Sequence, residues 1–131
     1  MTARAKTIGY WTTTALLVLG VVSGGAAELA RSPGTIEGIV GLGYPAYLAT
    51  ILGVWKLLGT VALLAPRFPR LKEWAYAGIF FNMTGAAISH AVCGDAAWHV
   101  LVTLGLAGLA VASWALRPPT RTLGALLPAQ S

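Results

Sequence analysis

Four apolar runs, each long enough to cross a lipid bilayer, constrain the fold of this chain more than any other feature. They cover residues 8–27, 46–65, 74–94 and 96–116. Each run is close to the roughly 20 residues that a helix needs to cross a hydrocarbon core about 30 Å thick. Backbone polar groups in lipid must bond within their own segment, so the runs are predicted to be helices. The sequence therefore predicts an all-α fold, a four-helix transmembrane bundle.

The composition of the chain favours a membrane over water as its solvent. Of its 131 residues, 56% are hydrophobic and only 10% are charged, and the mean hydropathy is +0.73. A soluble domain has about 25% charged residues, and a chain this short buries too little surface to hide so many apolar side chains. We expect a single membrane domain that comprises residues 1–131.

The basic residues predict the orientation of the helices. Seven of the nine Lys and Arg residues fall on one side of the predicted membrane. They are Arg4, Lys6, Arg67, Arg70, Lys72, Arg117 and Arg121. Since loops rich in basic residues stay in the cytoplasm, both termini are predicted to be cytoplasmic. The formal net charge of +5 is thus an orientation signal, and because the basic residues form no face with interleaved aromatic residues, nucleic-acid binding is not indicated.

The loop between the first two runs predicts a short fifth helix. Ser32 followed by Pro33 is typical of a helix start, and Gly43 is typical of a helix end. Apolar residues recur at helical spacing between them. We therefore expect this helix to lie along the extracytoplasmic membrane surface with its apolar face inward.

The first run has an alternative interpretation as a cleaved signal peptide. A basic segment precedes it, and the small residues of GGAAELA near its end offer cleavage sites. Cleavage would leave three spans. The apolar run is long for a signal peptide, which favours a retained helix.

One cation, Lys56, interrupts the second run. A lysine near the bilayer centre costs about 2.5–3.5 kcal/mol on insertion scales, so such a residue usually faces the bundle interior and finds a partner. Lys56 and Asn82 lie at similar distances from the short loop 66–72 and therefore at a similar depth. We expect the Asn82 amide to accept a hydrogen bond from Lys56, with Thr60 and Thr84 as further candidates.

Further polar residues predict a seam through the bundle interior. Asn82 and Ser89 share a face of the third run with His90 beside it, and Glu28 ends a repeat of small residues on the first run. Small residues allow close helix contact, and polar residues bond across it. We predict a cavity that opens outward, with Lys56 at its floor and Glu28 and His90 toward its mouth. All five residues are candidate ligand-binding residues.

Four residues of metal-ligating types lie in and around the turn between the last two runs. They are His90, Cys93, Asp95 and His99, but their spacing matches no recognised zinc motif. The sequence therefore predicts no metal site, and Asp95 and His99 are expected to form a solvated rim. Cys93 is the only cysteine and is expected to be a small buried residue.

Residues 44–95 resemble the DoxX-like family of small bacterial membrane proteins. The matching motifs are YP at 44–45, GVWKLLG at 53–59, KEWAYAG at 72–78 and TGAAISH at 84–90. The hydropathy pattern extends the similarity over about residues 8–116. The resemblance implies a four-helix, multi-pass protein of the bacterial inner membrane.

The resemblance also implies a function. The family takes its name from a subunit associated with a quinone-linked oxidoreductase, and relatives are described as parts of membrane oxidoreductase complexes. A protein of this kind is expected to bind a lipophilic molecule such as a quinone and to act with an oxidoreductase partner. The resemblance transfers no catalytic residue, but the matching positions include Lys56, Asn82, Ser89 and His90.

Two alternative functions follow from the same residues. The chain could be a non-catalytic membrane adaptor or assembly subunit, in which Lys56 is only structural. It could instead carry a small solute or a proton along the polar seam. Because four helices are few for a transporter, that function would require a homodimer.

Overall fold

A computed structural model describes residues 2–122 of the chain, and every regular element in this range is a helix. The elements are α1 (Ala3–Leu29), α2 (Pro33–Gly41), α3 (Leu48–Leu64), α4 (Pro69–Val92), α5 (Ala97–Ala115) and the 3₁₀ helix η1 (Pro119–Arg121). The prediction of an all-α fold is confirmed for these residues. The predicted domain also included residues 1 and 123–131, which lie outside the described range.

The helix ends differ from the ends of the apolar runs because individual residues at the ends decide them. α1 begins at Ala3 rather than at residue 8, since the Thr2 hydroxyl accepts a hydrogen bond from the Ala5 amide at 3.1 Å. α4 begins at Pro69, directly after Phe68 in the left-handed conformation (φ 55°). Apolarity alone therefore located the helices but not their first turns.

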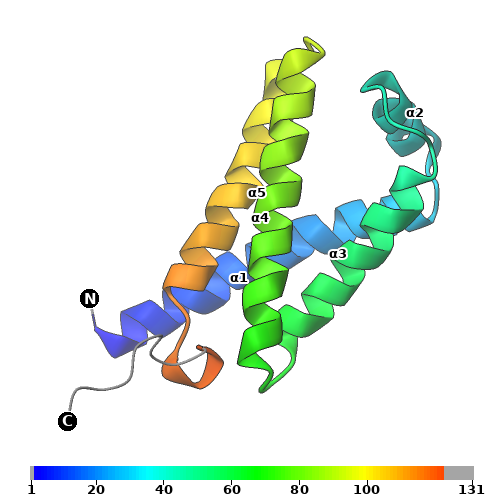
Figure 1. Cartoon of the computed structure of the whole chain (residues 1–131). Coiled ribbons are helices and arrows are strands. Elements are labelled where there is room, and N and C mark those ends of the chain that lie inside the picture. The colour runs from blue at the N-terminus through cyan, green and yellow to red at the C-terminus, as the bar shows by residue number, and fades with distance from the viewer. Residues whose placement is uncertain (1, 123–131) are drawn as a thin grey trace.

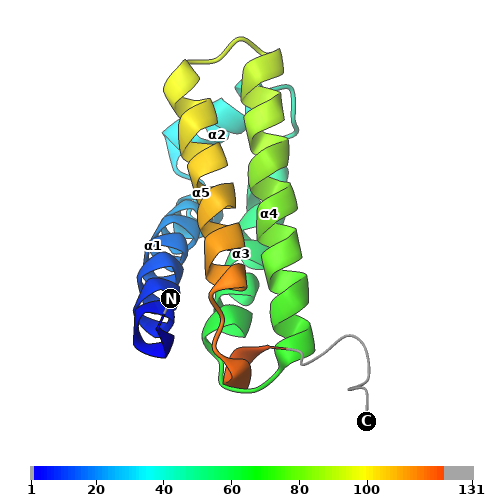
Figure 2. The ribbon, with the colours of Figure 1, turned by 90° about the vertical axis from the view of Figure 1, so that its left-hand side faces the viewer.

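The helices pack as an antiparallel pair with two further long helices against one side. α4 and α5 lie side by side in both views (Figures 1 and 2). α1 packs against both α3 and α5. α3 meets α4 at their connecting turn and diverges from it toward its other end, where α2 lies (Figure 1). The divergence leaves one flank of α4 uncovered by α3.

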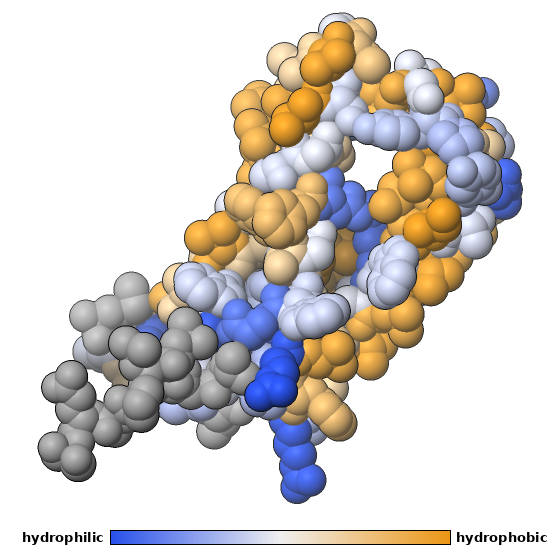
Figure 3. Space-filling view, viewed as in Figure 1, coloured by the Kyte–Doolittle hydropathy of each residue, from blue (hydrophilic) through white to orange (hydrophobic). Residues whose placement is uncertain are grey.

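Two of the helices are long and apolar enough to cross a membrane, namely α1 and α5. α3 is apolar but has only 17 residues, and α4 contains the polar residues Asn82 and His90 within its apolar stretch. Large apolar side chains are exposed on all four helices, as the broad hydrophobic areas in Figure 3 illustrate. The structure thus confirms helices at all four predicted runs and identifies two of them as candidate membrane spans.

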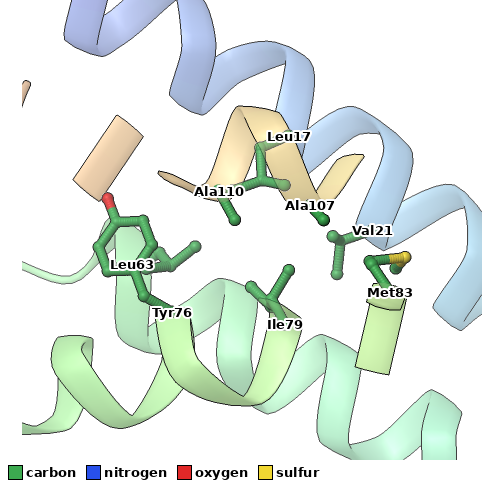
Figure 4. Close-up of a cluster of buried hydrophobic side chains, with 8 residues drawn as sticks. All are labelled: Leu17, Val21, Leu63, Tyr76, Ile79, Met83, Ala107 and Ala110. Atoms are coloured by element: carbon green, nitrogen blue, oxygen red, sulfur yellow. The ribbon is translucent and has the colours of Figure 1, made fainter. Parts of the chain in front are cut away.

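The core is a small cluster where the four long helices meet (Figure 4). Its members come from α1 (Leu17, Val21), α3 (Leu63), α4 (Tyr76, Ile79, Met83) and α5 (Ala107, Ala110). The alanines let α5 approach closely, in keeping with the small residues that line helix contacts in membrane proteins. The cluster fixes α1 against α4 and α5, so α1 is an integral part of this fold.

A buried hydroxyl network joins three helices beside the core. The Ser113 hydroxyl lies 2.6 Å from the Thr14 hydroxyl and 2.7 Å from the Tyr76 hydroxyl. All three residues are buried. Because each hydroxyl can both donate and accept, the three groups can satisfy one another without water.

Lys72 stabilises the turn between α3 and α4 from inside the protein. It is 1% exposed, and its ammonium donates to the carbonyl oxygens of Ala62 (2.9 Å), Ala65 and Arg67 (2.7 Å). These bonds satisfy carbonyls that the end of α3 leaves without helical partners. Burial, with a smaller contribution from the nearby positive charge of Arg121, lowers the pKa of Lys72 from its usual 10.5. The sequence reasoning treated Lys72 only as a loop charge and missed this role.

Candidate functional site

A cavity of about 1130 Å³ lies between α3 and α4 and extends to α2. Its volume is at the upper end of the range of ligand pockets, roughly 300–1,000 Å³. The structure brings all five predicted site residues to its lining, namely Glu28, Lys56, Asn82, Ser89 and His90. Most of the other lining residues are apolar or aromatic. Figure 3 shows the opening, with hydrophilic atoms deep inside it.

The principal polar feature of the cavity wall is an ion pair between Lys56 and Glu28. The Lys56 ammonium lies 2.5 Å from Glu28 Oε1, and the two side chains are only 11% and 9% exposed. The prediction that Asn82 accepts the hydrogen bond of Lys56 is therefore wrong. A carboxylate is the stronger partner because both groups are charged. Glu28 is also buried and belongs to the last turn of α1.

A close contact between two glycines explains why Lys56 reaches Glu28. A Cβ atom on Gly53 would lie 2.9 Å from the Gly25 carbonyl oxygen, and one on Gly25 would lie 3.1 Å from Lys56 Cβ. α1 and α3 therefore approach each other where only glycine fits. This approach brings the last turn of α1 beside the middle of α3, so Glu28 lies within reach of Lys56.

One oxygen of Glu28 has no protein partner in the described part of the chain. Glu28 Oε2 is buried and accepts no hydrogen bond, whereas Oε1 accepts from Lys56. A buried acceptor without a partner loses its hydration without compensation, which costs about 1–3 kcal/mol or more for a charged group. Glu28 lines the cavity, so a small rotation of its carboxylate would bring this oxygen within reach of a hydroxyl or amine of a bound molecule.

Asn82 contributes a second polar group to the cavity from α4. It is half-buried and lies on the helix that diverges from α3. Thr60 and Thr84, the other predicted partners of Lys56, instead donate to carbonyls of their own helices, those of Lys56 (2.9 Å) and Phe80 (2.8 Å). The predicted polar seam is therefore not continuous: the Glu28–Lys56 pair joins α1 to α3, and Asn82 lies separately on α4.

The extent of the cavity also differs from the prediction. Its lining runs from Gly34 in α2 to Trp74 near the start of α4, so Lys56 lies midway and not at a floor. Near α2 the Tyr44 hydroxyl lies 2.7 Å from the Ser89 hydroxyl, which ties the segment after α2 to α4. Tyr44 was not among the predicted site residues. Its position beside Pro45 in a matching family motif was the available signal.

His90 joins the cavity to a polar cluster on the α4–α5 turn. Its Nδ1 lies 2.7 Å from Asp95 Oδ2, and His99 Nδ1 lies 3.3 Å from Asp95 Oδ1. The Ala96 amide, followed by the His90 ring, donates to Asp95 and lowers the pKa of its carboxyl from the usual 3.8. Cys93 is exposed, so the prediction that it is buried is wrong.

Several aromatic residues line the cavity, and the sequence did not identify them as site residues. Trp55, Trp74 and Phe81 line the cavity and are also largely exposed on its outer side. The sequence carried one signal for them, because Trp55 adjoins Lys56 in the middle of an apolar run. Flat apolar rings beside a charged pair are suited to a molecule with a polar head and an apolar body.

Comparison with known proteins identifies the family. The profile of the DoxX-like family matches residues 12–113, which include all of α2, α3 and α4 and most of α1 and α5. The chain belongs to the DoxX-like family. This result confirms the family suggested by the motifs of residues 44–95 and identifies the chain as a DoxX-like membrane protein. No curated protein and no solved structure matches it significantly.

Proposed function

We propose that this DoxX-like protein binds a lipophilic molecule with carbonyl or hydroxyl groups, such as a quinone, in the cavity between α3 and α4. We further propose that α1, α3, α4 and α5 span the bacterial inner membrane as one domain with cytoplasmic termini. The long exposed apolar surface of these helices and the distribution of basic residues support this arrangement.

The observation that carries the proposal is the unpartnered Glu28 oxygen beside Lys56 in the wall of a largely apolar cavity. Lys56 is a hydrogen-bond donor and Glu28 Oε2 is an acceptor. A quinone carbonyl would accept from Lys56, and a quinol hydroxyl would donate to Glu28. The pair therefore offers a complementary group to both forms of such a head group.

The apolar remainder of the cavity suits the body of the same molecule. Trp55, Leu58 and Phe81 line it together with many aliphatic residues. α3 diverges from α4 (Figure 1), and the cavity between them is open on one side of the molecule (Figure 3), which in a membrane would face the acyl chains. A hydrophobic ligand would enter from the bilayer, and Asn82 and His90 would bind polar groups on the α4 side.

The family resemblance supports an oxidoreductase as the partner of the protein, with the bound quinone as the molecule they share. The alternative of an adaptor without a ligand predicts that a helix of a partner protein occupies the flank between α3 and α4. The alternative of a proton or solute pathway requires a dimer. Ligand binding distinguishes the first function from both others.

Tryptophan fluorescence provides a direct test, because Trp55 and Trp74 line the cavity and quinones quench indole emission on contact. The purified protein in detergent is titrated with a short-chain benzoquinone. We expect saturable quenching that is lost when Trp55 and Trp74 are replaced by Phe.

The matched variants are Glu28→Gln and Glu73→Gln. Glu73 bonds Arg117 and the Trp114 indole at 2.8 Å and does not line the cavity. We expect Glu28→Gln to weaken the affinity at least ~10-fold, the effect of about 1.4 kcal/mol, and Glu73→Gln to leave it unchanged. Quenching that rises linearly without saturation, or equal affinity in both variants, would overturn the proposal.

A further inference from the structure

A cluster of three side chains of metal-ligating types lies on the turn between α4 and α5, outside the part of the cavity that contains Lys56. His90 is in the last turn of α4, Asp95 is in the connection and His99 is in the first turn of α5. A tight turn brings them together, with Gly94 in the left-handed conformation (φ 68°) and the Asp95 amide donating to the His90 carbonyl at 2.9 Å. A glycine at this position avoids the strain that a side chain would introduce.

The three side chains converge on one small volume. One ligand atom from each residue lies within 4.8 Å of the others. Asp95 Oδ2 lies 2.7 Å from His90 Nδ1, and Asp95 Oδ1, which accepts from the Ala96 amide at 2.8 Å, lies 3.3 Å from His99 Nδ1. The two imidazole rings are stacked with their centroids 5.0 Å apart. The turn therefore aligns two nitrogens and one carboxylate oxygen before any ion is bound.

His99 shows that hydrogen bonds within the cluster do not satisfy all of its groups. Its Nδ1 atom is buried but has no hydrogen-bond partner of acceptable geometry in the described residues, although Asp95 is 3.3 Å away. A buried ring nitrogen without a partner is costly as a hydrogen-bonding group. As a metal ligand, the same nitrogen would be satisfied.

We propose that His90, Asp95 and His99 bind a divalent first-row transition ion such as Zn²⁺. Two imidazole nitrogens and a carboxylate favour Zn²⁺, Co²⁺, Ni²⁺ or Cu²⁺ over Mg²⁺ and Ca²⁺, which prefer oxygen ligands. Three protein ligands leave one or more positions for water. This proposal replaces the sequence-based expectation of no metal site and does not depend on quinone binding.

Cys93 is excluded from the site by its direction. Its thiol is exposed and lies 3.7 Å from the Leu42 carbonyl oxygen, toward the segment after α2. A ligand set without sulfur has a distinct spectrum with Co²⁺, because thiolate ligands add intense charge-transfer absorption in the near ultraviolet. The spectrum therefore tests the composition of the site as well as its existence.

The test uses the full chain purified in detergent without a polyhistidine tag and stripped of metal with a chelator. Co²⁺ is the probe, and Zn²⁺ is the competitor. We expect one Co²⁺ per chain, visible d–d bands without thiolate absorption, and displacement by one equivalent of Zn²⁺. His99→Gln and Asp95→Asn should each weaken Co²⁺ binding at least ~10-fold, since even changes behind a metal ligand have effects of that size.

Two controls alter similar groups outside the cluster. Cys93→Ser removes the nearby thiol, and Glu37→Gln removes an exposed acid on α2; both should bind Co²⁺ as the unaltered protein does. Circular dichroism checks that every variant is folded. The assignment would be overturned if the unaltered protein bound Co²⁺ no more tightly than a triple variant of His90, Asp95 and His99. Loss of Co²⁺ binding in Cys93→Ser would also overturn it.

Discussion

The Glu28–Lys56 pair allows the energetics of the cavity to be tested with a double-mutant cycle. Two unit charges 2.5 Å apart attract by roughly 7 kcal/mol at an effective dielectric constant of about 20. Desolvation of both ions offsets part of this attraction, so the loss on removing one partner of a buried pair is about 3–5 kcal/mol. Both side chains are almost fully buried, so solvent screening reduces this value little.

We expect Lys56→Met to destabilise the protein by about 3–5 kcal/mol, because it leaves the Glu28 carboxylate buried without a counter-charge. In a Glu28→Gln background the same substitution removes no ion pair and should cost about 1 kcal/mol or less. The measurement is reversible unfolding in mixed micelles, followed by circular dichroism for the four members of the cycle. An equal cost of Lys56→Met in both backgrounds would refute the view that the pair is held together as an ion pair.

Three further predictions concern the fold around the site. Gly53→Ala should destabilise the protein by about 1–3 kcal/mol, the cost of overpacking, because its Cβ would meet the Gly25 backbone. The control is Gly59→Ala on the same helix, whose Cβ would meet nothing within 4 Å. Equal unfolding midpoints for the two variants would contradict the close contact. Lys72→Met should cost about 1–3 kcal/mol or more by leaving carbonyls at the end of α3 unsatisfied, and an unchanged unfolding free energy would show that water replaces the ammonium. Ser113→Ala should cost about 1–3 kcal/mol because it leaves two buried hydroxyls without their shared partner. Unfolding of this variant in mixed micelles would measure the loss, and an unfolding free energy equal to that of the unaltered protein would contradict the hydroxyl network.

The sequence predicted the helices well because apolar length is a local property. Each of the four runs is a helix, and the start of α2 at Pro33 follows from a local capping signal. The ends shifted where Thr2 and Phe68 set the first turns of α1 and α4. Such helix ends depend on single residues that a hydropathy pattern does not register.

The site was predicted in its residues but not in its pairing. Counting from the α3–α4 loop put Asn82 at the depth of Lys56, and that argument assumed that the two helices stay in contact. α3 instead packs on α1 through Gly25 and Gly53 and diverges from α4. Which of several glycine-bearing faces forms the closest contact is a property of the whole bundle. One sequence does not determine it.

The cluster of His90, Asp95 and His99 was missed for a similar reason. The spacing of these residues matches no recognised motif, since their proximity results from a left-handed Gly94 and not from one helix face. The same turn directs the Cys93 thiol away from the cluster. The conformation of a tight turn decides both outcomes.

The central claim is that the cavity beside Glu28 and Lys56 holds a lipophilic molecule. Native mass spectrometry of the protein released from membranes, with identification of the molecule that dissociates from it, tests this claim most directly. The account predicts one bound quinone-like molecule per chain, lost in the Glu28→Gln, Lys56→Met double variant and retained in Glu73→Gln. A bare chain mass for the unaltered protein, or equal retention in the double variant, would contradict it.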